Sequence, residues 1–246
     1  MKTPKMILFD YGQTLVKEAC FDGVKGTQAV MAYAIENKHN LSAKQIQAEA
    51  DAINNEIGRF DPDRKYSVQT EVHNAVFNAY LYESLGIKLS LSGEEYDRIF
   101  WEAAAPGVPT EGIQDFLSCL KKQNIRTGVI SNIRFCGSAL KARINQCIPE
   151  NAFEFILATS EYLFRKPNRR IFDLALEKAG LPAKEVWYVG DQYKFDVEGA
   201  RNAGMYPVWY LGTGSETGRK EEGVLIVRSW SELQGKLAEL TEDAVK

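Results

Sequence analysis

The sequence contains few of the residues that build disulfide frameworks, zinc sites or histidine-based catalytic systems. It holds four cysteines and two histidines among 246 residues. The cysteines are far apart and form no C-x-x-C pair; they are Cys20, Cys119, Cys136 and Cys147. This spacing argues against a zinc site and a disulfide framework, so we expect four reduced thiols. The two histidines do not support a histidine-based nucleophilic system.

The sequence also lacks a long hydrophobic run and an excess of charge of one sign. The apolar stretch MILF at residues 6–9 is far too short for a signal peptide or a membrane span. The 30 basic and 33 acidic residues give a net charge of -3 and are spread along the chain, without the basic concentration that nucleic-acid binding requires. We therefore expect a cytoplasmic protein that binds neither nucleic acid nor membranes.

Short apolar, β-branched runs recur in the second half of the chain and predict buried strands. They lie at residues 125–131, 153–159, 186–190, 206–211 and 224–227. Helical patterns alternate with them at residues 112–123, 169–179 and 196–203, and a surface helix is expected after residue 229. This alternation predicts an α/β protein with a parallel sheet. At 246 residues and 45% hydrophobic content, the chain can bury a sizeable core.

Residues 23 to about 103 differ from the rest of the chain. Their apolar residues recur at helical spacing, as in Ile46, Ile53 and Ile57, and they contain no convincing strand. Glycine and proline mark the exit of this block at residues 105–112. The block is therefore predicted to be a helical insertion.

The insertion predicts two domains, with residues 18–105 as a helical cap and residues 1–17 and 106–246 as the α/β core. Because it follows the first strand, the cap is expected over the carboxyl ends of the strands, where open α/β sheets bind ligands. Arg59 and Arg64 of the cap flank the sequence FDPD. A cap over the strand ends would allow both arginines to contact a substrate anion, but we interpret them as part of a solvated face.

Four polar residues follow predicted strands: Asp10, Ser131, Lys166 and Asp191. In a parallel sheet, such residues project toward one rim. Together they supply a nucleophilic carboxylate, a hydroxyl donor, a fixed cation and a second carboxylate, which suit an anionic group and Mg²⁺. This set predicts that Asp10 attacks a phosphoryl group whose charge is neutralised by the metal and Lys166. The product would be an aspartyl-phosphate that water hydrolyses.

Four segments in chain order resemble the motifs of the haloacid dehalogenase-like hydrolase superfamily. They are FDYGQTL at 9–15, VISN at 129–132, RKPNRRIF at 165–172 and GDQYKFDVEGARNAG at 190–204. Each segment alone is a weak signal, whereas four in order at plausible spacing are a strong one. The resemblance covers the chain outside the insertion. It implies a Rossmann-like core and the subgroup whose helical cap follows the first motif.

The resemblance also implies roles for residues that contact the substrate. Asp10 would be the nucleophile that attacks a small phosphorylated metabolite. Ser131 and Lys166 would hold the phosphoryl oxygens, and Lys166 would also counter the charge on Asp10. Asn132, which follows Ser131 in the same motif, would be a further substrate-binding residue.

A Mg²⁺ site is implied beside the nucleophile. The carboxylate of Asp10 and the backbone carbonyl of Gly12 would bind the ion. Asp191 would bind it directly or through water, and Asp196 would support the site.

Gly12 departs from the pattern of the phosphatases in this superfamily. The residue two positions after the nucleophile is usually an aspartate that protonates the leaving group and later activates water. General acid–base assistance of this kind accelerates a reaction by about 10²- to 10⁴-fold. Its absence favours acyl or aryl phosphates as substrates, or a proton donor from the cap or the substrate.

This departure leaves other functions open. Haloacid dehalogenases also attack through the first aspartate without an acidic residue two positions later, but they need no metal and usually lack the aspartate that begins GDQYKFD. Phosphonate-cleaving members add a cap lysine, for which Lys17, Lys25, Lys38 and Lys65 are all available. A catalytically weakened protein that binds an anion or a protein partner is a further alternative. The motifs determine neither the natural substrate nor the oligomeric state.

Overall fold

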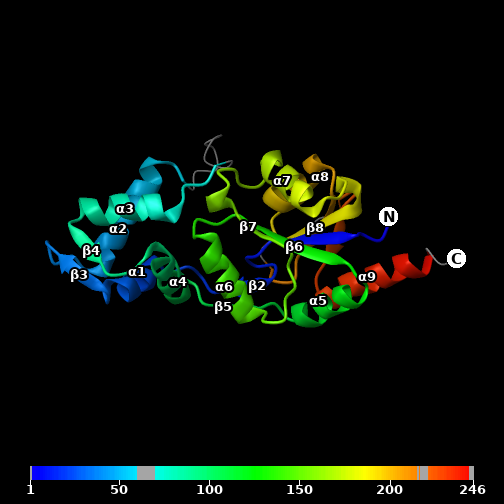
Figure 1. The fold of residues 1–246 in the computed structure, drawn as a ribbon, viewed down its shortest axis with the longest axis horizontal. Helices are drawn as coiled ribbons and strands as arrows, with labels where there is room; N and C mark the ends of the chain where they lie inside the picture. Colours follow the sequence, from blue (N-terminus) through cyan, green and yellow to red (C-terminus); the bar gives the residue numbers. More distant parts are fainter. Residues whose placement is uncertain (1, 60–69, 215, 217–220, 244–246) are drawn as a thin grey trace.

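A six-stranded parallel sheet forms the centre of the core (Figure 1). The computed structural model describes residues 2–59, 70–214, 216 and 221–243. The sheet consists of β1 (Met6–Phe9), β6 (Arg126–Ser131), β7 (Ile156–Ala158), β8 (Val186–Gly190), β9 (Tyr206–Tyr210) and β10 (Leu225–Val227). Their order is β10-β9-β8-β1-β6-β7, and every pairing is parallel. The predicted α/β core with a parallel sheet is therefore confirmed.

Helices cover both faces of this sheet because alternate strand residues point to opposite sides. Met6 and Leu8 of β1 pack with the helices α7 (Arg169–Ala179) and α8 (Glu198–Ala203). Ile7 and Phe9 pack in the opposite layer, against α5 (Ile113–Lys122), α6 (Gly137–Cys147) and α9 (Trp230–Asp243). All four β1 side chains are fully buried, and each such burial stabilises the fold by about 2 kcal/mol.

The described part of the insertion between β2 and β5 contains four helices. They are α1 (Gly23–Met31), α2 (Ala43–Glu56), α3 (Asn74–Ser84) and α4 (Gly93–Ala104). Ser42 and Ser92 begin α2 and α4 with capping boxes, in which Gln45 and Glu95 bond back to the cap residue. In Figure 1 this helical block lies at one end of the molecule, beside the core sheet.

The prediction that the insertion contains no strand is wrong. β3 (Ala34–Asn37) and β4 (Ile87–Leu89) form an antiparallel pair within it. Both strands are short and pair only with each other among the described residues, and Ile35 is largely exposed. Each strand is only three or four residues long, and the AIEN of β3 shows no alternation of apolar and polar residues, so neither stretch gives a clear strand signal.

The two segments that connect the insertion to the core run side by side. β2 (Val16–Glu18) pairs antiparallel with β5 (Gly107–Pro109). The amide of Ala19 donates to the Pro106 carbonyl, 2.9 Å away, and extends this ribbon toward the cap. The domain boundaries stay a prediction, but the ribbon explains why the entry and the exit of the insertion are found together.

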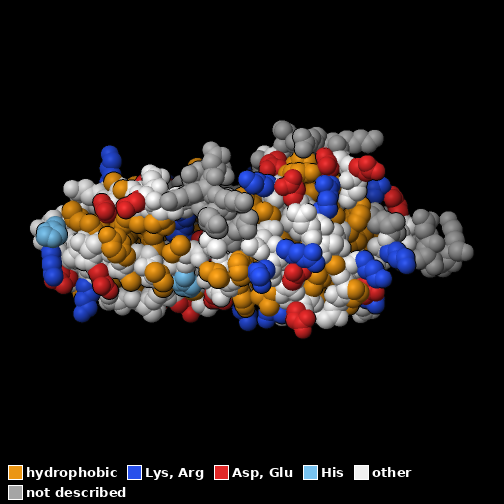
Figure 2. All heavy atoms as spheres, turned by 90° about the horizontal axis from the view of Figure 1, so that it is seen from above, with side chains coloured by type: hydrophobic (Ala, Val, Ile, Leu, Met, Phe, Trp, Pro, Cys, Tyr) orange, Lys and Arg blue, Asp and Glu red, His pale blue; other side chains and the backbone are white. Residues whose placement is uncertain are grey.

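The remaining short elements are the 3-10 turns η1 (Thr159–Glu161) and η2 (Ala183–Glu185) and the π-helical turn η3 (Tyr193–Val197). No helix among the described residues is long and apolar enough to cross a membrane. Figure 2 shows side chains of both charges interspersed over the core and hydrophobic side chains gathered over the cap. The exposed apolar residues of this region include Val72, Val76 and Tyr80, which are four positions apart.

Candidate active site

The carboxyl ends of three neighbouring strands meet at one edge of the sheet. β8, β1 and β6 are adjacent and parallel, so Asp191, Asp10 and Ser131 lie next to one another at their ends. Lys166 joins them from the loop before α7, and Asp196 joins them from η3. The structure therefore brings together the residues that the four motifs supplied.

Lys166 forms the centre of this group. Its Nζ lies 2.7 Å from Asp10 Oδ1 and 2.6 Å from Asp196 Oδ1, and it donates a hydrogen bond to the Tyr188 hydroxyl at 2.9 Å. Burial alone would lower the pKa of Lys166, but the charges of Asp10 and Asp196 outweigh this effect and leave the pKa raised. The side chain is therefore a permanent cation beside Asp10.

Asp10 is a carboxylate that is difficult to ionise in the metal-free protein. Burial raises its pKa to about 6, and the negative charge of Asp196 acts in the same direction. The charge and the hydrogen bond of Lys166 lower the pKa, but by less. Above pH 6, Asp10 is predominantly the ionised form that a nucleophile needs.

Asn132 holds the loop that carries Lys166. Its side-chain Nδ2 donates to the Lys166 carbonyl at 2.9 Å, and its Oδ1 accepts from the Lys166 amide at 2.7 Å. This reciprocal pair positions the cation, a role that the motif did not predict. Direct contact between Asn132 and a substrate stays a prediction.

Three buried carboxylates form a group that fits a divalent cation. One oxygen from each of Asp10, Asp191 and Asp196 lies within 4.8 Å of the others. Such hard oxygen donors are the ligands that Mg²⁺ prefers. Asp196 already bonds Lys166 through Oδ1 and the Gln192 amide through Oδ2, so it fits a supporting role better than a direct one. Asp10 and Asp191 would be the direct carboxylate ligands.

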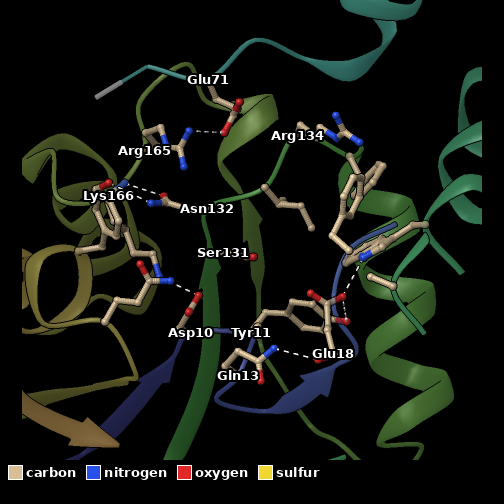
Figure 3. A pocket seen from close by; sticks show the side chains of 18 of the residues that line it. Asp10, Tyr11, Gln13, Glu18, Glu71, Ser131, Asn132, Arg134, Arg165 and Lys166 are labelled. Atoms are coloured by element: carbon tan, nitrogen blue, oxygen red, sulfur yellow. Dashed lines mark hydrogen bonds and ion pairs between the residues drawn. The ribbon is translucent and has the colours of Figure 1, made fainter. Parts of the chain in front are cut away.

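A cavity of about 740 Å³ opens above this rim, between the core and the cap. Figure 3 shows Ser131 at its centre, with Asp10 and Lys166 on one side and Glu18 on the other. Ser131 is buried at the end of β6. A phosphoryl group held by Ser131 would therefore lie within reach of Asp10.

A buried ion network connects the cap to the core across this cavity. Glu71 lies 3.1 Å from Arg59 and 3.2 Å from Arg165, measured between the ion-pairing atoms. The interpretation of Arg59 as part of a solvated face is wrong, because its side chain is only 4% exposed. It is buried because Glu71 and the Val72 carbonyl, 2.6 Å away, satisfy its guanidinium. Arg64 lies outside the described residues.

Arg134 is a further cation that lines the cavity. Its guanidinium carbon lies 5.1–5.3 Å from the ring centres of Phe21, Phe100 and Phe135. Burial lowers its pKa to about 10, and the charge of Arg59 acts in the same direction, so it is protonated at neutral pH. No described residue forms a salt bridge or a hydrogen bond with its guanidinium. The cavity therefore suits an anionic ligand.

A comparison with models of known protein families assigns the chain to a family. A family model described as haloacid dehalogenase-like hydrolase matches residues 4–204, which is most of the chain. The chain belongs to the haloacid dehalogenase-like hydrolase family. The resemblance that the four motifs predicted is thereby confirmed.

Two curated relatives of this hydrolase family match part of the chain. Pyrimidine 5'-nucleotidase YjjG of Escherichia coli (strain K12) is 31% identical over 131 residues, which cover 52% of this chain and 56% of that protein. Glyceraldehyde 3-phosphate phosphatase of Pyrococcus furiosus is 31% identical over 101 residues, or 40% of each chain. The matched stretch therefore spans about half of these relatives or less.

Solved structures of haloacid dehalogenase-like proteins share the whole fold. A 2-haloacid dehalogenase from Pseudomonas syringae superposes with a TM-score of 0.64 at 21% identity, over 97% of this chain and 99% of that one. A phosphatase from Thermococcus onnurineus also has a TM-score of 0.64, at 20% identity, over 96% of this chain and 98% of that one. At these identities the likeness concerns the fold alone, and it includes the cap.

Sequence reasoning about this family member did not find Glu18, Glu71 or Arg134. Glu18 and Glu71 lie outside the four motifs, and isolated glutamates carry no signal of their own. Arg134 follows VISN by two positions, and this proximity to a motif is the signal by which it could have been found.

Proposed function

We propose that this hydrolase is a Mg²⁺-dependent phosphatase of small phosphorylated metabolites that forms an aspartyl-phosphate on Asp10. The observation that carries the proposal is the buried group of Asp10, Asp191 and Asp196 around one rim. The haloacid dehalogenases of this family need no metal. Because this chain has Asp191 and Asp196 beside the nucleophile, phosphoryl chemistry is favoured over dehalogenation. When bound there, Mg²⁺ would neutralise phosphate charge and thereby let an anion attack phosphorus.

The residues of the chain have separate tasks in this proposal. Asp10 attacks the phosphorus atom in line with the leaving oxygen. Lys166 keeps Asp10 ionised and neutralises charge on the phosphoryl oxygens, while Ser131 donates a hydrogen bond to one of them. Asn132 fixes the loop of Lys166, so that this cation does not have to reorganise during the reaction.

The relatives and the cavity support the same class of substrate. The names of the two curated relatives describe a nucleotidase and a phosphatase, both of which act on phosphate esters. Lys166 and Arg134 are two of the cations that line this cavity of about 740 Å³, and their charges suit a small anionic molecule.

Phosphate release in the presence of Mg²⁺ or chelator tests this function. Wild-type protein, assayed with acetyl phosphate and a panel of alkyl phosphates, is expected to release phosphate only with Mg²⁺. Asp10→Asn removes the nucleophile, and we expect activity to fall by about 10⁴-fold or more. The variant Asp173→Asn, on the exposed face of α7, is the matched control and should retain activity.

Dehalogenation is the alternative function, because haloacid dehalogenases, like this chain with Gly12, have no acidic residue two positions after the nucleophile. Asp10-dependent halide release from a 2-haloacid in the presence of chelator, without phosphate release from any ester, would favour it. Absence of both reactions would favour a protein that binds an anion without turnover.

A further inference from the structure

We propose that Glu18 is the general acid and base of this site and replaces the aspartate that is missing at position 12. The proposal rests on the phosphatase function proposed above and concerns the proton that its leaving group needs. The observation behind it is the direction in which residue 12 faces. Apart from Tyr11 and Gln13 on either side of it in the chain, a Cβ atom built on Gly12 would have one described neighbour within 4 Å, the Oε2 atom of Glu18 at 3.7 Å.

This distance places the two carboxylates in the same region of the cavity. An aspartate at position 12 would carry its oxygens within about 2.5 Å of its own Cβ, from ordinary bond lengths. Glu18 Oε2 therefore lies beside the place that those oxygens would occupy. Glu18 also lines the cavity together with Asp10 and Ser131, and Figure 3 shows it across Tyr11 from Asp10.

The backbone does not require glycine at position 12. Its φ lies outside the left-handed region, and no described residue other than its two chain neighbours and Glu18 would lie within 4 Å of an added Cβ. An aspartate would therefore fit, and its absence is a chemical difference rather than a consequence of crowding. A second carboxylate beside Glu18 would add repulsion without adding a new function.

The two carboxylate oxygens of Glu18 have different surroundings: Oε1 is held by hydrogen bonds, and Oε2 faces position 12. Oε1 accepts hydrogen bonds from Trp101 Nε1 at 2.8 Å and from the Tyr11 hydroxyl at 3.2 Å, and it lies 3.5 Å from Arg143 Nη2. These partners come from the cap helix α4, the strand-end loop and the core helix α6. The orientation of Glu18 therefore depends on cap and core together, and Oε2 faces position 12.

The protonation of Glu18 agrees with the role of an acid. Burial raises its pKa above the ordinary value, while Arg143, Trp101 and Tyr11 oppose the shift and Asp10 adds to it. A raised pKa lets a carboxyl group hold a proton closer to neutral pH than a solvated glutamate does.

The proposed reaction balances in two steps. As Asp10 forms a bond to phosphorus, the bond from phosphorus to the leaving oxygen breaks, and Glu18 gives its proton to that oxygen to release an alcohol. Glu18, now a carboxylate, then takes a proton from water as the water oxygen attacks the phosphorus. The bond between phosphorus and Asp10 breaks, which restores Asp10 and releases inorganic phosphate.

Glu18→Gln tests the proposal because glutamine keeps the shape and the acceptor oxygen but carries no transferable proton. For alkyl phosphates, kcat/KM should fall by about 10²- to 10⁴-fold. For acetyl phosphate, whose leaving group needs no proton, kcat/KM should change little, while the phosphorylated enzyme should accumulate because water is no longer activated. Gly12→Asp in the Glu18→Gln background should restore turnover of alkyl phosphates.

Glu102→Gln is the matched control. Glu102 pairs with the same Arg143, 3.1 Å away, but its side chain is 55% exposed and does not line the cavity. It should leave both substrates unaffected, and circular dichroism should show both variants folded.

The outcomes separate this proposal from the proposed function. Equal loss of kcat/KM for acetyl and alkyl phosphates in Glu18→Gln, without rescue by Gly12→Asp, would assign Glu18 a structural role. Wild-type turnover of acetyl phosphate but of no alkyl phosphate would show that no acid is supplied and would also overturn the proposal. No phosphate release from any substrate would instead refute the phosphatase function itself.

Discussion

The pKa of Asp10 is set by two opposing effects, because burial raises it and the positive charge of Lys166 lowers it. Burial and Asp196 raise its pKa to about 6, and without Lys166 the value would be higher still. Asp10 and Asp196 in turn keep Lys166 protonated against its own burial. The pKa of Asp10 and the pKa of Lys166 therefore depend on each other and on the charge of Asp196.

The raised pKa of Asp10 makes the stability of the metal-free protein depend on pH. The folded protein holds this proton more tightly than the unfolded chain, in which the pKa is near 3.8. The resulting stabilisation is complete below pH 3.8 and is lost as the pH rises through about 6. Asp10→Asn does not titrate, so between pH 4 and pH 7 its free energy of unfolding should gain about 2 kcal/mol relative to wild type.

Urea unfolding of both proteins with chelator at several pH values measures this difference. Parallel curves for wild type and Asp10→Asn across this range would show that Asp10 has an ordinary pKa. Excess Mg²⁺ should abolish the penalty above pH 6, because the ion favours the ionised carboxylate.

The end of β8 and the turn η3 must approach each other closely for Asp196 to reach Lys166. A Cβ on Gly190, the last residue of β8, would overlap the carboxyl group of Asp196. Gly190→Ala should therefore displace η3, destabilise the fold by about 1–3 kcal/mol and lower phosphatase activity. Gly93→Ala is the control, because at the start of α4 an added Cβ would have no described neighbour within 4 Å outside the adjacent residues and the helix's own backbone.

Thermal unfolding and the phosphate-release assay check this prediction. Wild-type activity and stability in Gly190→Ala would show that the turn adjusts without disturbing Asp196. Loss of stability without loss of activity would show that the contact serves the fold alone.

Elements with a strong pattern were predictable from the sequence, and the others depended on tertiary contacts. The strands β6 and β8 are buried along nearly their whole length and centre on apolar, β-branched residues, so their positions agree with the prediction within one residue. The helix α7 agrees at both ends, where Asn168 and Gly180 cap it. By contrast, β3 and β4 have few buried residues.

The same distinction applies to the site. Asp10, Ser131 and Asp191 were predictable because a polar residue at the end of a buried strand has a fixed place at the sheet edge. Glu18 and Glu71 come from a linker and from the cap, and their positions follow from how these segments pack on the core. A sequence pattern confined to one segment does not contain that information.

In the molecule as a whole, cap and core each supply part of one site. The core provides the strand-end residues, and the cap closes the cavity above them through the pair of Glu71 with Arg165. Arg143 of the core bonds both Glu18 and Glu102, so it connects the linker and α4 to the core. This arrangement leaves the Asp10 side chain only 10% exposed beside Lys166, and low exposure strengthens the electrostatic interaction between the two.

The most direct test of the account is to isolate the covalent intermediate. Protein turning over acetyl phosphate is quenched with acid, digested and analysed by mass spectrometry. We expect one phosphoryl group on the peptide that contains Asp10, formed only with Mg²⁺ and absent from Asp10→Asn. Phosphate release without modification of Asp10 would contradict the account.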